Sequence, residues 1–170
     1  GLLFVICPVF YGFSVYVEMS VLCGVALLWL IELVDQITRG SLDALGIHSW
    51  QVWSLPSIFL APWLHADWAH LIANTGPALV LGFLVTLAGM GRFLGATLII
   101  WILGGFGTWL IGNIGAPRGV ESVHIGASGL IFGWLTFLIV FGFFTRHAWQ
   151  IVVGIIVLFV YGGVLWGALP

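Results

Sequence analysis

The stretch HIGASGLIFGWLTFLIVFGFF, residues 124–144, decides the fold of this chain. A short polar segment changes at Ser128 into an apolar run that reaches Phe144, and a transmembrane helix needs roughly 20 mostly apolar residues. Gly126 and Gly129 flank the serine, so a small hydroxyl lies at the mouth of a hydrophobic helix. Polar groups inside a bilayer are costly and tend to mark function, which makes Ser128 the first candidate site residue.

The composition of the whole chain points to lipid as its solvent. Of 170 residues, 62% are hydrophobic and only 6% are charged, whereas a soluble domain carries about 25% charged residues. The sequence therefore predicts an all-α polytopic membrane protein that lies in a lipid bilayer. The net charge of −2 provides no basic surface, so no nucleic-acid partner is expected.

The hydrophobic segments predict five transmembrane helices. We expect them at about residues 20–34, 70–90, 93–112, 128–144 and 148–169. Residues 1–19 are also apolar, and they are either a lead-in to the first helix or an extra short span broken by Pro8. The loop arginines divide equally between the two sides, so the positive-inside rule does not fix the orientation, although the more acidic side is favoured as the outer one.

The first connection, residues 35–67, is long and too polar to cross the membrane. Pro56 and Pro62 exclude a long helix there. The segment also holds several large aromatic side chains, which are Trp50, Trp53, Phe59 and Trp63. Because tryptophan prefers the membrane interface, we expect this connection to lie in the headgroup region.

Two further polar residues, His70 and Asn74, lie in the second predicted span. Their i, i+4 spacing places both side chains on one helical face, one turn apart. Such a pair either holds two helices together by hydrogen bonds or directs two donors at one point. The spacing alone leaves both interpretations open.

Ser128 has a similar pair of interpretations. A serine in a transmembrane helix commonly bonds to the backbone of the preceding turn. At a helix start, however, free N–H groups and the positive end of the helix dipole converge on the hydroxyl, which suits an oxyanion hole. The pattern is G-x-S-G rather than the G-x-S-x-G of the hydrolase elbow, and no strands are predicted.

Three other residues are candidates for a supporting role. Gly129 and Gly133 have the G-x-x-x-G spacing that lets transmembrane helices approach closely. His65 precedes His70 by five residues and is a candidate anchor between the first connection and the second span. The histidines lack the spacing of metal ligands, so neither a metal nor another cofactor is expected.

Taken together, these motifs resemble the rhomboid family of intramembrane serine proteases, of the bacterial type. The resemblance lies in H-x-x-x-N on the second span, in G-A-S-G at residues 126–129, in the long aromatic first connection, and in the run LHADWAHLIANTGPALVLGF at residues 64–83. It covers about residues 20–170 and implies a rhomboid-like helical bundle with a six-helix core. It also implies a bacterial plasma membrane location, and it does not indicate an oligomeric state.

The resemblance implies a role for each candidate. Ser128 is expected to be the nucleophile, while His70, Asn74 and the backbone around Gly126 stabilise the oxyanion of a cleaved transmembrane protein substrate. The general base is expected to be a histidine on a sixth span, which this sequence does not contain, so we expect the chain to be part of a longer protease. The alternative is a catalytically inactive relative that binds transmembrane helices. A channel or transporter is not favoured, because inverted repeats and mid-span charges are not evident.

Overall fold

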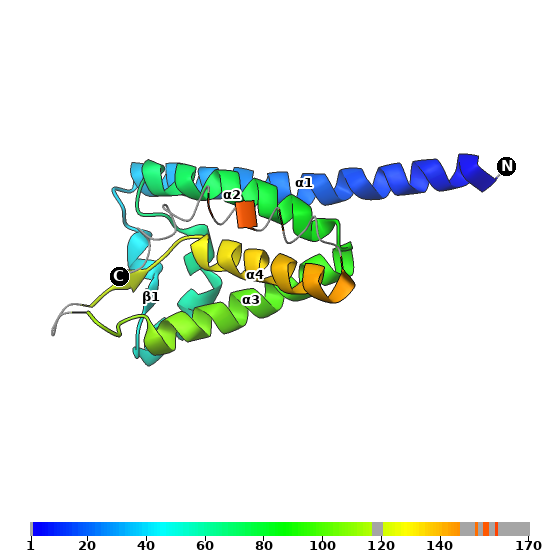
Figure 1. Cartoon of the computed structure of the whole chain (residues 1–170). Coiled ribbons are helices and arrows are strands. Elements are labelled where there is room, and N and C mark those ends of the chain that lie inside the picture. Colours follow the sequence, from blue (N-terminus) through cyan, green and yellow to red (C-terminus); the bar gives the residue numbers. More distant parts are fainter. Residues whose placement is uncertain (1, 117–120, 147–151, 153–154, 157–158, 160–170) are drawn as a thin grey trace.

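The computed structural model describes residues 2–116, 121–146, 152, 155, 156 and 159, and it describes the side chains from residue 19 onward. The predicted fifth span, residues 148–169, lies outside the described residues except for four isolated positions. The remainder is a helical bundle with its N-terminus at one end (Figure 1).

Four long helices make up the described bundle. They are α1 (Leu2–Ile37), α2 (Trp68–Thr86), α3 (Met90–Ile111) and α4 (Ser128–Thr145). Each has a stretch that is long and apolar enough to cross a membrane, which in α1 is Met19–Ile37. The predicted all-α polytopic membrane fold is therefore confirmed for the part of the chain that the structure describes.

Helix α1 runs without interruption from Leu2 to Ile37, so residues 2–19 lie in the same helix as the first span. Figure 1 shows its N-terminal part extending beyond the other helices. The 36 residues of α1 correspond to about 54 Å of helix, whereas the hydrocarbon core of a bilayer is about 30 Å thick.

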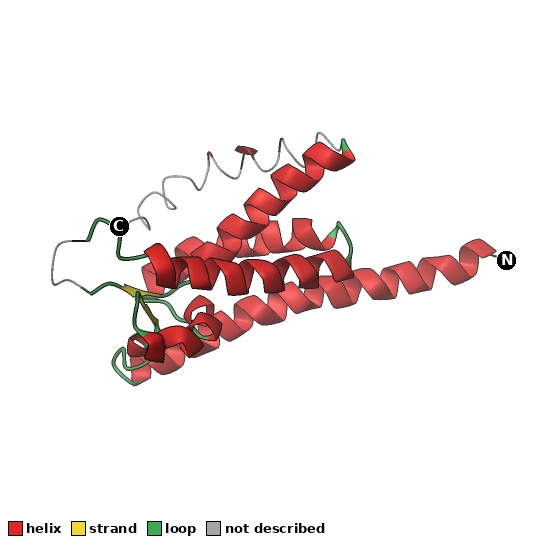
Figure 2. Cartoon of the chain, turned by 90° about the horizontal axis from the view of Figure 1, so that it is seen from below, coloured by secondary structure: helices red, strands yellow, loops and turns green. Residues whose placement is uncertain are grey.

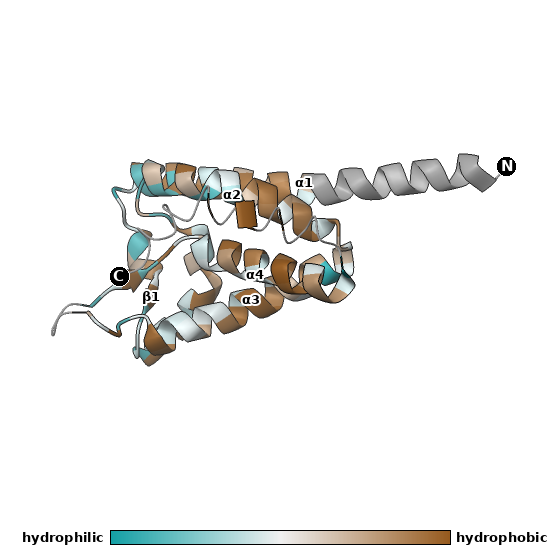
Figure 3. Ribbon diagram, viewed as in Figure 1, coloured by the Kyte–Doolittle hydropathy of each residue, from teal (hydrophilic) through white to brown (hydrophobic). Residues whose placement is uncertain are grey.

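Helix α4 lies at the centre of the packing. It packs on both α2 and α3, while α1 packs on α2. Ile131, Leu135 and Leu138 repeat at helical spacing along one face of α4 and are almost completely buried. They contact a core that includes Leu71 and Leu81 of α2. Many large apolar residues of the helices are exposed, as a lipid solvent requires, and Figure 3 colours much of the helical ribbon as hydrophobic.

The first connection folds into short elements at the end of the bundle remote from the N-terminus. They are the 3-10 helices η1 (Asp43–Leu45), η2 (Val52–Phe59) and η3 (Ala61–Trp63), and the strand β1 (Ile47–His48). β1 pairs antiparallel with β2 (Val123–His124), with Ile47 opposite His124. Figure 2 shows these strands at that end, and Figure 3 shows most of the hydrophilic colour there.

Tryptophan indoles fasten the first connection to α3. The Nε1 of Trp101 donates to the carbonyl of Ile58 at 2.8 Å, and the Nε1 of Trp109 donates to the carbonyl of Gln51 at 3.0 Å. Trp53 and Phe59 of the same connection remain 62% and 56% exposed. Exposed aromatic rings at this end of the bundle support the predicted headgroup position of the connection.

Candidate active site

Ser128 is the first residue of α4, and the turn before it is held by a specific backbone bond. Gly126 has a φ of +115°, a conformation that a residue with a Cβ rarely adopts. Its N–H donates to the carbonyl of Ala61 in η3 at 2.8 Å. Ala127 occupies the N-cap position without a side-chain cap. The first N–H groups of α4, including that of Ser128, therefore have no intrahelical partner and are available to a ligand.

His70 is directed to the same turn by the start of α2. Asp67 is the N-cap residue of this helix, and its Oδ1 accepts a hydrogen bond from the backbone N–H of His70 at 2.7 Å. A Cβ built on Gly126 would lie 2.8 Å from Nε2 and 2.7 Å from Cε1 of His70. The imidazole therefore packs directly on the Gly126 backbone, two residues before the serine.

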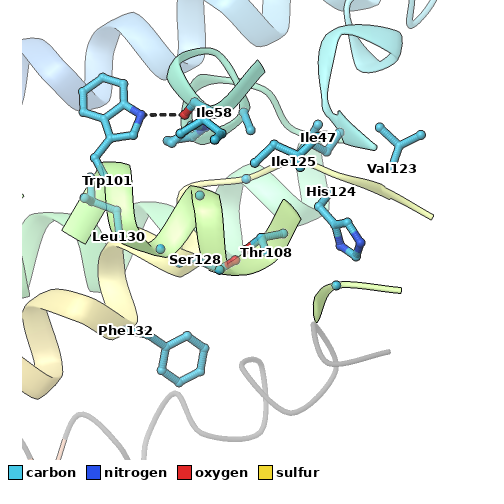
Figure 4. A pocket seen from close by; sticks show the side chains of 18 of the residues that line it. Ile47, Ile58, Trp101, Thr108, Val123, His124, Ile125, Ser128, Leu130 and Phe132 are labelled. Atoms are coloured by element: carbon cyan, nitrogen blue, oxygen red, sulfur yellow. Dashed lines mark hydrogen bonds between the residues drawn. The ribbon is translucent and has the colours of Figure 1, made fainter. Parts of the chain in front are cut away.

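Ser128, His70 and Gly126 line one cavity of about 1010 Å³. The described walls come from the starts of α2 and α4, the end of α3, the first connection and β2. Thr108 of α3, His124 and Phe132 also line the cavity, and Figure 4 shows their side chains with Ser128 around it. The cavity places a hydroxyl, an imidazole and free backbone N–H groups around a common space.

Asn74 does not line this cavity. It is 5% exposed, and its Nδ2 donates to the carbonyl of His70 at 3.0 Å. The structure thus places the amide in a local hydrogen bond to its own helix. One of the two amide N–H groups of Asn74 is thus engaged within its own helix.

His65 lies in contact with His70. The two ring centroids are 5.1 Å apart in an edge-on arrangement, and His65 is only 2% exposed. Neither ring nitrogen of His65 has a hydrogen-bond partner among the described residues. Burial, and secondarily His70, lower the pKa of His65 to about 4, and the nearby backbone of Trp63 opposes this shift. His65 is therefore a neutral ring at neutral pH.

The two glycines of the G-x-x-x-G pair have different surroundings. A Cβ on Gly129 would meet nothing within 4 Å, and Gly129 lines the cavity. A Cβ on Gly133 would collide with the side chain of Ile100 on α3. Gly133 is therefore a packing contact between α4 and α3, and open space lies only beside Gly129.

Sequence reasoning missed the roles of Asp67 and Ala61. An aspartate three residues before the amide that it caps is a recognisable helix-start signal, so Asp67 could have been found. The bond between the Ala61 carbonyl and Gly126 joins segments 65 positions apart and leaves no local sequence signal. Among the described residues, no group of three or more His, Cys, Asp or Glu is arranged to hold a metal ion.

Buried polar atoms gather at the same end of the bundle. Glu32 and Asp35 of α1 are 1% and 2% exposed, and each has one carboxylate oxygen without a hydrogen-bond partner among the described residues. Their other oxygens accept bonds from Gln36 and from the backbone of Leu42. These carboxylates give α1 a polar end next to the start of α2.

Comparisons with known proteins agree with this architecture. Residues 49–170 match the family model of the rhomboid domain. An uncharacterized protein of Mycobacterium tuberculosis strain H37Rv is 60% identical over 151 residues, which cover 89% of this chain and 62% of that protein. An uncharacterized protein of Mycobacterium leprae is 56% identical, covering 89% of this chain and 59% of that protein. No solved structure matches.

The chain thus spans about three-fifths of the length of these relatives. The matched region includes α2, α3 and α4, and with them Ser128, His70 and the cavity between them. The match covers more than half of the chain, and the relatives are closely similar to it. The protein is an integral membrane protein, and it belongs to the rhomboid family.

Proposed function

We propose that the full-length protein is an intramembrane serine endopeptidase that cleaves membrane-spanning segments of other proteins. The observation that carries this proposal is the shared cavity of Ser128 and His70 beside the uncapped start of α4. In the reaction, the Ser128 Oγ attacks the scissile carbonyl and loses its proton to a general base. The C–N bond then breaks as the protonated base returns the proton to the departing amine. Water hydrolyses the acyl-serine to a carboxylic acid and restores the Ser128 hydroxyl.

The oxyanion is the charge that this site is built to stabilise. The backbone N–H of Ser128 lies at the positive end of α4 and has no intrahelical partner. His70 adds a side-chain donor at the adjacent Gly126 turn. One such donor typically contributes about 2.7–4 kcal/mol to transition-state stabilisation, or roughly a hundredfold to a thousandfold in kcat. Asn74 contributes to oxyanion stabilisation in one of two ways. Its second amide N–H donates to the oxyanion, or its bond to the His70 carbonyl holds the backbone of His70 in place.

The mechanism needs a general base for Ser128. No described side chain forms a hydrogen bond with its hydroxyl. His124 lines the cavity, but its ring lies against the end of α3, where a Cβ on Gly112 would be 2.6 Å from Nε2. We propose that the base is a histidine of a further span, as the family resemblance implies.

An inactive relative that binds transmembrane helices is the alternative. It is favoured by the lack of a described hydrogen-bond partner for the Ser128 hydroxyl. The presence of Ser128, His70 and the positive-φ Gly126 turn in one cavity favours the enzyme, because a helix-binding surface needs none of these groups. The Mycobacterium relatives support a bacterial plasma membrane as the location.

The test uses the full-length protein in liposomes with a panel of single-span substrate proteins. Ser128→Ala should abolish cleavage while the protein keeps its helical content and thermal stability. Thr136→Ala is the matched control, because it removes an exposed hydroxyl of the same helix that bonds only to the carbonyl of Phe132. Cleavage by the Ser128 variant at the control rate would refute the nucleophile. Binding of substrates without cleavage by any version would establish the inactive alternative.

A further inference from the structure

A second, smaller cavity lies between α1 and α3. Its volume is about 160 Å³. Helix α1 contributes residues from Ser20 to Leu28, and α3 contributes residues from Phe93 to Trp101. Each stretch covers eight helical steps, or about 12 Å along the axis. The cavity is therefore long and narrow, and it runs in the direction of the helices.

Two of the three tryptophans that line this cavity, Trp101 and Trp134, use their indole N–H groups within the protein and offer no hydrogen bond to a ligand. The Trp101 Nε1 donates to the carbonyl of Ile58 at 2.8 Å, and the Trp134 Nε1 donates to the Thr97 hydroxyl at 2.9 Å. Among the residues that the structure describes, no charged side chain lines the cavity, and most of its other walls are aliphatic or aromatic. A ligand that fits this surface is an apolar chain.

The cavity is continuous with the bilayer-facing surface of the protein. Helix α1 packs mainly on α2, and α3 packs mainly on α4, so α1 and α3 are not a principal packing pair. Figure 1 shows α4 lying between them. Gly24 of α1 lines the cavity, and a Cβ there would meet nothing within 4 Å. Exposed leucines lie on the same two helices, among them Leu27 on α1 and Leu98 on α3.

The size of the cavity selects among apolar occupants. An α-helix with its side chains is about 10–12 Å wide and does not enter such a narrow space. An engineered apolar cavity of about 150 Å³ stays dry and takes up benzene, so a hydrocarbon fits a volume of this order. An empty space would leave the lining side chains without dispersion contacts. We propose that this cavity binds one acyl chain of a bilayer lipid.

The acyl chain would lie behind the turn that carries Ser128. Ala127, Leu130 and Ile131 all line the small cavity, and they belong to that turn and to the start of α4. Pro62 and Leu130 also line the larger cavity, so they form part of a wall between the two. A bound chain therefore packs against the back of the candidate active site. This inference does not depend on the proposed proteolytic activity.

The test places the full-length protein in nanodiscs of phosphatidylcholine that contains a photoreactive diazirine in one acyl chain. After irradiation, mass spectrometry maps the labelled residues. Ile131 and Trp134 line the cavity but are only 1% and 7% exposed, so lipid outside the cavity does not reach them. Gly24→Leu fills the cavity. Gly95→Leu is the matched control, because Gly95 is an exposed helical glycine that lines neither cavity.

The expected result is labelling of Ile131 or Trp134 in the wild type and in Gly95→Leu, and its loss in Gly24→Leu. Labelling of the exposed Leu98 should be equal in all three proteins and reports correct insertion. Labelling confined to exposed residues in the wild type would overturn the proposal. So would labelling of Ile131 that is unchanged by Gly24→Leu. Native mass spectrometry gives a second readout, since one retained phospholipid should be lost only in the Gly24 variant.

Discussion

The imidazole of His70 lies on the backbone of Gly126, so closely that a Cβ at position 126 would be 2.8 Å from its Nε2. This contact joins the start of α2 to the turn before Ser128. Gly126 also has a φ of +115° and donates its N–H to the Ala61 carbonyl. The glycine is therefore required for two reasons, the backbone conformation and the space that the imidazole occupies.

Gly126→Ala should damage both stability and activity. A strained backbone conformation costs about 1–3 kcal/mol, and the added methyl group displaces the His70 ring. We expect a lower midpoint of thermal unfolding and loss of any cleavage that depends on Ser128. Gly129→Ala is the control for stability, because its Cβ meets nothing within 4 Å and its φ is not positive. If both variants unfold at the wild-type temperature, the contact does not constrain the turn.

Asp67 should contribute to the position of His70 through the helix cap. Its Oδ1 accepts from the His70 N–H at 2.7 Å, and loss of an N-cap side chain costs about 1 kcal/mol. Asp67→Ala should lower the free energy of unfolding by this amount and reduce cleavage, whereas Asp67→Ser should preserve both. The measurement is reversible unfolding in mixed micelles together with cleavage in liposomes. An equal loss in the Ala and Ser variants would show that the charge, rather than the cap, matters.

The helices were largely predictable because each is a long apolar run. The expected third and fourth spans, 93–112 and 128–144, differ from α3 and α4 by at most three residues at any end. The second span begins at Trp68 instead of His70 because Asp67 caps the helix earlier. The β1–β2 pair could not be expected, since two residues in each strand carry no periodic pattern.

The site was predictable in its residue types but not in its contacts. Ser128 and His70, which the motifs singled out, line one cavity in the structure. The spacing of His70 and Asn74 predicts that they share a helical face. It does not determine the hydrogen-bond partner of the Asn74 amide, which donates to the His70 carbonyl. Likewise, a G-x-x-x-G pattern does not say which glycine meets a neighbouring helix. Here it is Gly133, which meets Ile100.

Gly133→Ala should separate α4 from α3. The added Cβ collides with the branched side chain of Ile100, which is attached near the backbone and has little freedom to move away. Overpacking of this kind typically costs about 1–3 kcal/mol. The control is Gly104→Ala on α3, where a Cβ meets nothing within 4 Å. Gly133→Ala combined with Ile100→Ala should recover part of the loss. A single variant as stable as the control would contradict the close contact.

His65 should make the stability of the protein depend on pH in the acidic range. Its pKa is lowered from 6.5 to about 4 in the folded protein, chiefly by burial. The folded protein thus binds this proton less tightly than the unfolded chain does. Stability is complete above pH 6.5 and falls as the pH falls towards about 4. The shift corresponds to about 3 kcal/mol at the acidic end of this window.

His65→Phe should remove this dependence and leave stability near pH 7 almost unchanged. Neither ring nitrogen of His65 has a described hydrogen-bond partner, so an apolar ring loses no hydrogen bond and keeps the edge-on contact with His70. Burial also lowers the pKa of His124, so a smaller dependence of the same sign should remain. The measurement is the free energy of unfolding between pH 7.5 and pH 4 in both proteins. Parallel curves would show that His65 does not titrate differently in the folded and unfolded states. Stabilities that coincide near pH 7 and separate towards acidic pH, with the variant the more stable protein, are the expected result.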